Sequence, residues 1–398
     1  MAAGGDVLGL SLLGGGSVPP SILAAVFALV LFVILFITKL MGYFKILLNI
    51  ATFTYPNAFV SVKGNPCIQE RALNRLIESG TIPEVLALVR GYGFAIDIGD
   101  YATMEEIDRC FEEYFRSECT EIEHMVPVSV QPFFRAFSMF QETEVLKAAF
   151  RLKHASVAAR EMESLLGPVG IISQPLLQKM IDARNVDELV RLLQPTVYGP
   201  TLLSALGDAA MERTTLPFER ALDTFACEHL RSSLAHSDAL QTPPLMDFVA
   251  FYFDITNIKI ALRGLRDGVE MDVLAQYFLP TGHHITRDVQ KRMSEARSVH
   301  DMHGHLQHTP YFDAFNAALM AYEKSGSLQP IEAALDRALL DAVIRLSLVY
   351  HSGPATLLRY LVAKKFELQN VRAIVWGLQN RIAPETVRTL LIRQGGAA

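Results

Sequence analysis

The sequence predicts an almost entirely α-helical protein with one membrane-spanning helix near its N-terminus, and three observations carry that prediction. Apolar residues recur at three- and four-residue spacing in many segments, for example 104–116 and 331–349. Alternation of apolar and polar residues, the pattern of a half-buried strand, is scarce. Gly-Pro and Pro-Pro pairs at 167–168, 243–244 and 353–354 fall between these segments, where helices are expected to end.

The predicted membrane helix rests on sixteen consecutive apolar residues, Ile22–Ile37. With its flanks the run reaches about 20 residues, or roughly 30 Å of helix, which matches the hydrocarbon core of a bilayer. A secretory signal would need a basic start, and residues 1–21 contain no Lys or Arg. A helix lying in the membrane surface would show a charged face, and few soluble domains enclose so uniform a core helix. We therefore predict a membrane helix with a membrane-proximal extension over 18–55.

The charges around this segment predict its orientation. Lys39, Lys45 and Lys63 follow the apolar run, and nothing basic precedes it. The positive-inside rule therefore places residues 40–398 in the cytoplasm and leaves 1–17 as a tail on the other side of the membrane.

Three later segments of the chain align without a gap, which is the most informative feature of the sequence. They are FQETEVLKAAFR (140–151), YFDITNIKIALR (252–263) and KFELQNVRAIVW (365–376), separated by 112 and 113 residues. An acidic residue shares one column, and a basic residue follows five positions later. The residues singled out on this basis are the acids Glu142, Asp254 and Glu367, the asparagines Asn257 and Asn370, and the bases Lys147, Arg151, Lys259, Arg263 and Arg372.

A second element repeats with the same period. LQPTVY (193–198) and LQHTPY (306–311) lie 113 residues apart and share Leu, Gln, Thr and Tyr in register. The first copy has only LVRGYGF (88–94) in the corresponding place, which we interpret as degenerate. The two periods together predict three helical repeats, at 56–165, 166–278 and 279–398.

Helical geometry gives the aligned segments a physical meaning. Around the repeated base, positions such as Leu146, Ala149 and Phe150 are apolar at i, i+3 and i+4, which predicts a stripe facing the core. Lys147 and Arg151 are i, i+4 neighbours and are expected to crowd like charges on one exposed edge unless an acid meets them. The repeated acid points to another face, so we expect it to pair with a neighbouring helix. These residues are therefore either structural clamps of the repeat or contacts to a partner.

Several function classes find no support in the sequence. The net charge of −6 argues against a nucleic-acid-binding protein. No P-loop, GxSxG or HExxH motif is present, so we expect no catalytic residues and no cofactor. His300, His303 and His308 could ligate zinc from one helical surface, but no cysteine or carboxylate completes the pattern, and we expect no metal site. The four cysteines form no CxxC pair and are expected to be reduced thiols of a cytosolic body.

The repeated acid–Asn–base helix, the LQxTxY elements and the C-terminal string FELQNVRAIVWGLQNRIAPETVRTLLI (366–392) together resemble a known family. The chain is similar, over residues 53–392, to the C subunit of archaeal A-type and the d subunit of eukaryotic V-type rotary ATPases. The resemblance implies three helical bundles arranged as a pseudo-threefold funnel. It implies a non-catalytic adaptor whose partners are the central-stalk subunits and the proteolipid ring, and which couples ATP hydrolysis or synthesis to ion transport.

The predicted membrane helix departs from the resemblance, because the family attaches to the ring peripherally. A helix that enters the lumen of the ring could turn with it and would permit rotation. A fixed helix outside the ring would hinder rotation, and the protein would then be a variant that serves assembly. The alternative function from another class is a membrane-anchored helical scaffold that recruits unrelated cytosolic proteins. The choice between H⁺ and Na⁺, and between synthesis and hydrolysis, is not encoded in this protein's sequence.

Overall fold

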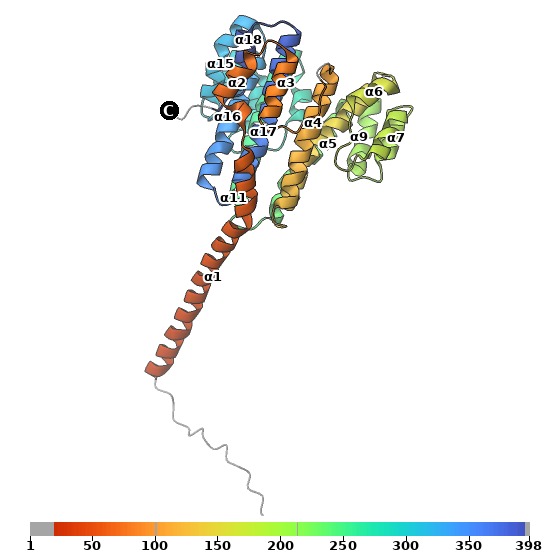
Figure 1. Cartoon of the computed structure of the whole chain (residues 1–398). Helices are drawn as coiled ribbons and strands as arrows, with labels where there is room; N and C mark the ends of the chain where they lie inside the picture. The colour runs from red at the N-terminus through yellow and green to blue at the C-terminus, as the bar shows by residue number, and fades with distance from the viewer. Residues whose placement is uncertain (1–19, 100–101, 213, 395–398) are drawn as a thin grey trace, which may run out of the picture. The chain divides into compact units, whose positions relative to one another are not determined.

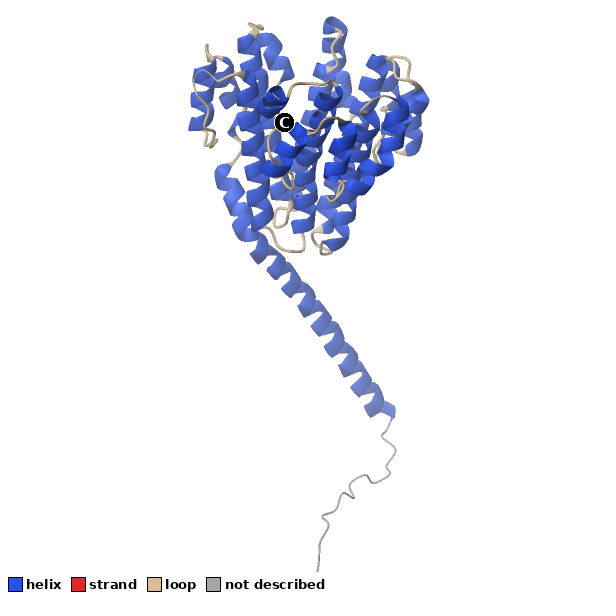
Figure 2. Ribbon diagram, turned by 90° about the vertical axis from the view of Figure 1, so that its right-hand side faces the viewer, coloured by secondary structure: helices blue, strands red, loops and turns tan. Residues whose placement is uncertain are grey.

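The computed structural model describes residues 20–394 except 100, 101 and 213 (Figure 1). The predicted tail 1–17 lies outside these described residues. The all-helical prediction is confirmed: the described chain consists of helices, turns and loops, with no strand beyond an isolated bridge between Val169 and Ile172 (Figure 2). The chain divides into an N-terminal unit, residues 1–51, and a helical body, residues 52–398, which we describe separately.

The N-terminal unit contains most of helix α1 (Pro20–Lys63), whose last turns belong to the body. Its side chains from 25 to 48 are all exposed, so this segment is not buried within the chain as a core helix would be. Among the described residues, α1 is the one helix long and apolar enough to cross a membrane. No Gly or Pro interrupts its apolar run over 22–37, which fits an unbroken helix.

The body is built from helices of very different lengths, joined by short loops. In chain order they are η1 (Pro66–Ile68), α2 (Glu70–Ile77), α3 (Ile82–Gly91), α4 (Met104–Met125), α5 (Gln131–His154), α6 (Ala159–Leu165), α7 (Gln174–Asp182), α8 (Val186–Leu193), α9 (Gly199–Glu212), α10 (Leu216–Ser233), η2 (Leu234–His236), α11 (Thr242–Asp267), α12 (Met271–Leu274), η3 (Ala275–Tyr277), α13 (Arg287–Glu295), α14 (Val299–His305), α15 (Phe312–Ser325), α16 (Gln329–Val349), α17 (Ala355–Gln379) and α18 (Pro384–Leu390).

The three aligned segments lie in the three longest helices of the body, α5, α11 and α17. The predicted apolar stripe is confirmed in each of them, since all nine side chains are buried to within 2% of full coverage. They are Leu146, Ala149, Phe150, Ile258, Ala261, Leu262, Val371, Ile374 and Val375. Prolines in the first turns of α5 and α11 favour helix initiation there, because proline fixes the helical φ and lacks only an N–H that has no partner at that position.

Packing joins the beginning of the body to its end. The second half of α5 packs with α6–α10 around one hydrophobic core, whereas a larger core runs from Phe53 to Ile392. In this larger core η1, α2 and α3 pack against α17. The backbone N–H of Gln394 also donates a hydrogen bond to the carbonyl of Ile68, at 3.1 Å. Residues assigned by the sequence to the first repeat therefore contact residues assigned to the third.

Candidate functional site

The two repeated sequence elements meet in the structure. The hydroxyl of Tyr198 donates a hydrogen bond to the carboxylate of Glu142 at 2.7 Å, across 56 residues. The hydroxyl of Tyr311 donates to Asp254 at 3.0 Å, across 57 residues. All four residues are buried. The tyrosine that ends each LQxTxY element is thus the partner of the repeated acid, a contact that was not predicted although both elements stand out in the sequence.

Glycines allow the backbone to approach these two acids closely. Asp254 also accepts hydrogen bonds from the backbone N–H groups of His284 and Ile285, at 2.8 and 3.0 Å. A Cβ on the nearby Gly282 would lie 2.2 Å from the Asp254 carboxylate. Gly170, 112 residues earlier, has φ +51° and leaves equally little space beside Glu142. This recurrence of glycine at the repeat period is the signal in the sequence that could have located the approach.

The third acid, Glu367, is held differently. It is fully buried and accepts hydrogen bonds from the Cys67 backbone N–H at 2.6 Å and from the Asn65 side chain at 3.1 Å. The ammonium of Lys364, one turn earlier in α17, lies 2.7 Å from its carboxylate and is itself only 3% exposed. Burial raises the pKa of Glu367, and the charge of Lys364 opposes that rise. The residues that meet this acid therefore come from its own helix and from the start of the body.

The two asparagines of the aligned segments each clamp a backbone 22 residues later. The Asn257 amide exchanges two hydrogen bonds with the backbone of Leu279, at 2.8 and 3.3 Å. The Asn370 amide does the same with Ile392, both at 2.7 Å, and also donates to the carbonyl of Cys67. In both places the asparagine amide satisfies a backbone N–H and a backbone C=O that have no partner in a helix or strand.

The repeated bases pair with acids of the same chain. Lys147 and Lys259 lie 2.8 and 2.5 Å from carboxylates 76 and 77 residues later, and the two arginines that follow them are also paired. The pairs are Lys147–Asp223 and Arg151–Glu219 between α5 and α10, Lys259–Asp336 and Arg263–Glu332 between α11 and α16, and Arg372 with Asp108 and Glu112 between α17 and α4.

The expectation of an exposed basic edge is wrong for Lys147, which is 8% exposed because α10 covers it. Burial alone would lower the pKa of Lys147, but the charges of Asp223 and Glu144 outweigh burial and raise it. Lys259 is also largely covered, with 17% of its side chain exposed. All ten residues singled out in the sequence are therefore engaged in contacts inside the chain, which hold helices together and present no reacting group.

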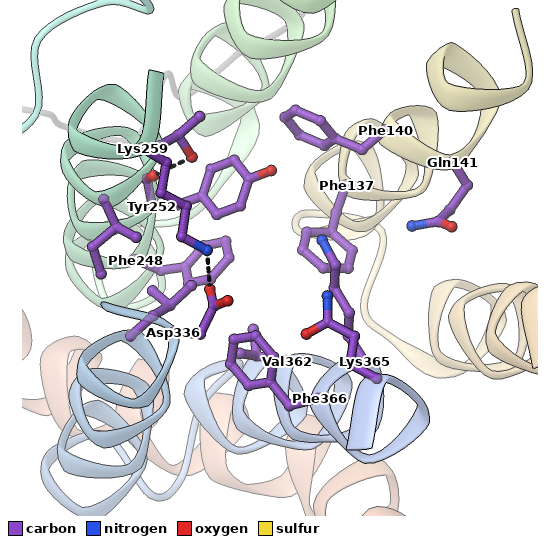
Figure 3. Close-up of a pocket in the computed structure, with 14 residues that line it drawn as sticks. Phe137, Phe140, Gln141, Phe248, Tyr252, Lys259, Asp336, Val362, Lys365 and Phe366 are labelled. Atoms are coloured by element: carbon purple, nitrogen blue, oxygen red, sulfur yellow. Dashed lines mark hydrogen bonds and ion pairs between the residues drawn. The ribbon is translucent and has the colours of Figure 1, made fainter. Parts of the chain in front are cut away.

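A pocket opens where α5, α11, α16 and α17 meet (Figure 3). Its volume is about 180 Å³, and its lining includes Phe137 packed on Phe248 and Phe140 packed on Tyr252, with ring centroids 6.0 and 5.4 Å apart. The Lys259–Asp336 ion pair forms part of one wall, and Lys365 lies on the opposite side. This pocket was not predicted from the sequence, although the first column of the alignment contains three of its residues, Phe140, Tyr252 and Lys365.

Comparison with known proteins gives a consistent result. Residues 56–390 match the family described as ATP synthase (C/AC39) subunit. The chain is 28% identical over 356 residues to the C subunit of the A-type ATP synthase of Methanocaldococcus jannaschii, an alignment that covers 87% of this chain and 88% of that relative. It is 26% identical over 341 residues to the C subunit of Methanothermobacter thermautotrophicus, covering 86% and 88%. It is 30% identical over 249 residues to that of Halobacterium salinarum, covering 62% and 70%.

The matched region begins after the predicted membrane helix and contains all ten residues singled out in the sequence, together with the two tyrosines that meet the repeated acids. The resemblance inferred from the repeated helix is confirmed by a match that covers most of the chain. This chain therefore belongs to the ATP synthase (C/AC39) subunit family, as a non-catalytic subunit of a membrane-associated A/V-type ATPase complex.

Proposed function

We propose that this protein links the central stalk of its rotary ATPase to the proteolipid ring, and so couples ATP hydrolysis or synthesis to ion transport. The observation that carries the proposal is the family match over residues 56–390. The contacts of the body fit a part that transmits force, because the paired acids, bases and asparagines tie α5 to α10, α11 to α16 and α17 to the start of the body. A body whose helices are joined by such ion pairs and hydrogen bonds deforms little under load.

The three predicted repeats form part of this proposal. The acid–tyrosine bonds span 56 and 57 residues, and the lysine–aspartate pairs span 76 and 77, which supports equivalent units around α5 and α11. For α17 the matching short helices are α2 and α3 at the start of the body. We infer that the units 56–165, 166–278 and 279–398 interlock, with the third completed by the beginning of the first.

The proposal includes the N-terminal helix as a membrane tether, with residues 40–398 on the cytoplasmic side. The exposed apolar surface over 25–48 and the lysines that follow the apolar run support it. Alkaline carbonate washing should leave the full chain in the membrane pellet and release a variant that lacks residues 1–51. Extraction of the intact protein by the same wash would rule the tether out.

Affinity purification of the full chain from detergent-solubilised membranes tests the linking role. We expect the central-stalk subunits and the ring proteolipid to co-purify in fixed ratio. Cysteine cross-linking from residues 25–48 to proteolipid positions that face the ring lumen, or to positions on its outer surface, distinguishes the two placements of the tether. Recovery of unrelated cytosolic proteins without ATPase subunits would favour a membrane-anchored scaffold.

A further inference from the structure

The pocket between α5, α11, α16 and α17 contains polar groups that the protein leaves unpaired. In the part of the chain that the structure describes, the Lys365 ammonium, the Tyr252 hydroxyl and the amides of Gln141 and Gln369 have no hydrogen-bond or ion-pair partner. All four side chains line the pocket and are half-buried, so they face space that solvent can enter. They contrast with Lys259 in the same pocket, whose charge is matched by Asp336 at 2.5 Å.

These unpaired groups share one chemistry. An ammonium has only donors, a phenol hydroxyl can donate, and each amide offers an N–H₂ group. Burial lowers the pKa of Lys365, because the side chains around it displace part of the water at its ammonium, and the charge of Asp336 offsets this only in part. A group with several acceptor atoms and a negative charge would satisfy the donors and compensate the ammonium together.

The walls restrict the kind of anion that fits. Phe137, Phe140, Phe248 and Phe366 surround the polar groups, and the volume of about 180 Å³ admits one or two side chains but no helix. A free inorganic anion would lose hydration against these rings and gain nothing from them. A glutamate side chain, with an apolar stem and a carboxylate tip, matches both the rings and the donors.

We propose that this pocket receives one acidic side chain, a glutamate flanked by apolar residues, from a protein of the central stalk, and that Lys365 is its charge partner. This inference rests on the proposed linking function. Of the ten residues singled out by the repeat, only Lys259 lines this pocket.

The position of Lys365 gives the contact a further consequence. Lys365 shares its alignment column with Phe140 and Tyr252, so the three long helices present two aromatic rings and a single cation to the same pocket. A receptor with three equivalent helices would accept a partner in three orientations. One cation among the three copies of this column favours a single orientation, because a carboxylate placed beside Phe140 or Tyr252 would find no unpaired ammonium, since Lys259 is already paired with Asp336. The pocket therefore sets the rotational register of the stalk on this protein.

The full-length chain, assembled with the stalk proteins of its complex, provides the test. Lys365→Glu reverses the charge, Lys365→Tyr introduces the residue that α11 has in this column, and Lys324→Glu reverses an exposed charge on α15 as a matched control. We expect Lys365→Glu to weaken stalk binding roughly tenfold or more, as for a desolvated charge pair, and the control to stay within twofold of wild type. A water-soluble carbodiimide, which joins an amine to a nearby carboxylate, should link Lys365 to one acidic residue of a stalk protein.

Two further measurements separate a binding role from a structural one. Lys365→Tyr should weaken stalk binding while raising the melting temperature of the isolated protein, because it removes a poorly solvated cation. Substituting Lys for the cross-linked stalk acid should restore binding to Lys365→Glu. The inference is overturned if the complex forms and Lys365→Glu binds as tightly as the control, or if no cross-link involves Lys365. Failure of the folded wild-type chain to bind the stalk would instead refute the linking function itself.

Discussion

Asp254 and Glu367 share a column of the repeat and are both fully buried, yet the protein holds them in different ways. Asp254 is surrounded by neutral donors, namely one tyrosine hydroxyl and two backbone N–H groups. Glu367 instead has an ammonium, a side-chain amide and one backbone N–H. The difference shows that fixed neutral dipoles can hold a buried carboxylate, and that a cation takes the place of the tyrosine where no LQxTxY element follows.

Among the variants that follow from this comparison, we expect substitution of Glu367 to cause the largest loss of stability. Glu367→Ala leaves Lys364 buried without its partner and removes the hydrogen bonds that Glu367 accepts from Asn65 and Cys67. We expect the free energy of unfolding to fall by about 3–5 kcal/mol, the usual cost of breaking a buried ion pair from one side. Urea denaturation followed by circular dichroism measures it.

The matched control for Glu367→Ala is the double variant Lys364→Met with Glu367→Leu. Replacing both partners by apolar residues leaves no uncompensated charge, so most of the lost stability should return. If the double variant were as unstable as Glu367→Ala, the loss would come from the backbone contacts to residues 65–67 and not from the stranded ammonium.

Asp254→Ala is expected to have the next largest effect. It leaves the Tyr311 hydroxyl and two backbone N–H groups without their acceptor, in a place where Gly282 shows how closely the backbone approaches. We expect a loss of about 2–4 kcal/mol, since each unsatisfied buried donor costs about 1–3 kcal/mol and water can re-enter the space left by the side chain. Asp254→Asn retains one acceptor oxygen and should lie between this variant and wild type in the same denaturation measurement.

The sequence predicted the helices and the core stripe because both depend on spacing along one helix. Leu146 and Phe150 are buried for the reason that the spacing indicates. It did not predict the burial of Lys147, because that depends on α10, which crosses α5 from about 70 residues further along. The acid–tyrosine bonds required knowing which elements meet, and alignment columns contain no distances. The pocket was missed because the first column of the alignment combines two aromatic residues with a lysine and so shows no shared chemical role.

Removing the tyrosine hydroxyls tests how much one neutral donor contributes to holding a buried acid, and smaller losses of stability are expected. Tyr311→Phe leaves Asp254 with two backbone donors, whereas Tyr198→Phe removes the hydroxyl that donates to Glu142. Each should lower the free energy of unfolding by about 1 kcal/mol. Thermal melts of both variants beside wild type measure the losses. A much larger loss in Tyr198→Phe would mean that Glu142 depends on its tyrosine more than Asp254 does.

The smallest effect is a difference in pH dependence between Glu142 and Glu332. Burial raises the pKa of Glu142 above the ordinary value of 4.5, so the stability contributed by this group is present below about pH 4.5 and is lost as the pH rises through the folded-state pKa. Burial also acts to raise the pKa of Glu332, but its hydrogen bonds and charge interaction with Arg263 outweigh burial and lower it. That contribution is present above about pH 4.5 and is lost as the pH falls.

Glu332→Gln should therefore lower the free energy of unfolding more at pH 7 than at pH 4. The difference should be less than about 1 kcal/mol because Arg263 is half exposed. Glu142→Gln should show the opposite trend. Urea denaturation of both variants between pH 4 and pH 7 measures the two slopes, and slopes of the same sign would contradict the assignment of burial as the dominant influence on Glu142 and of the ion pair on Glu332.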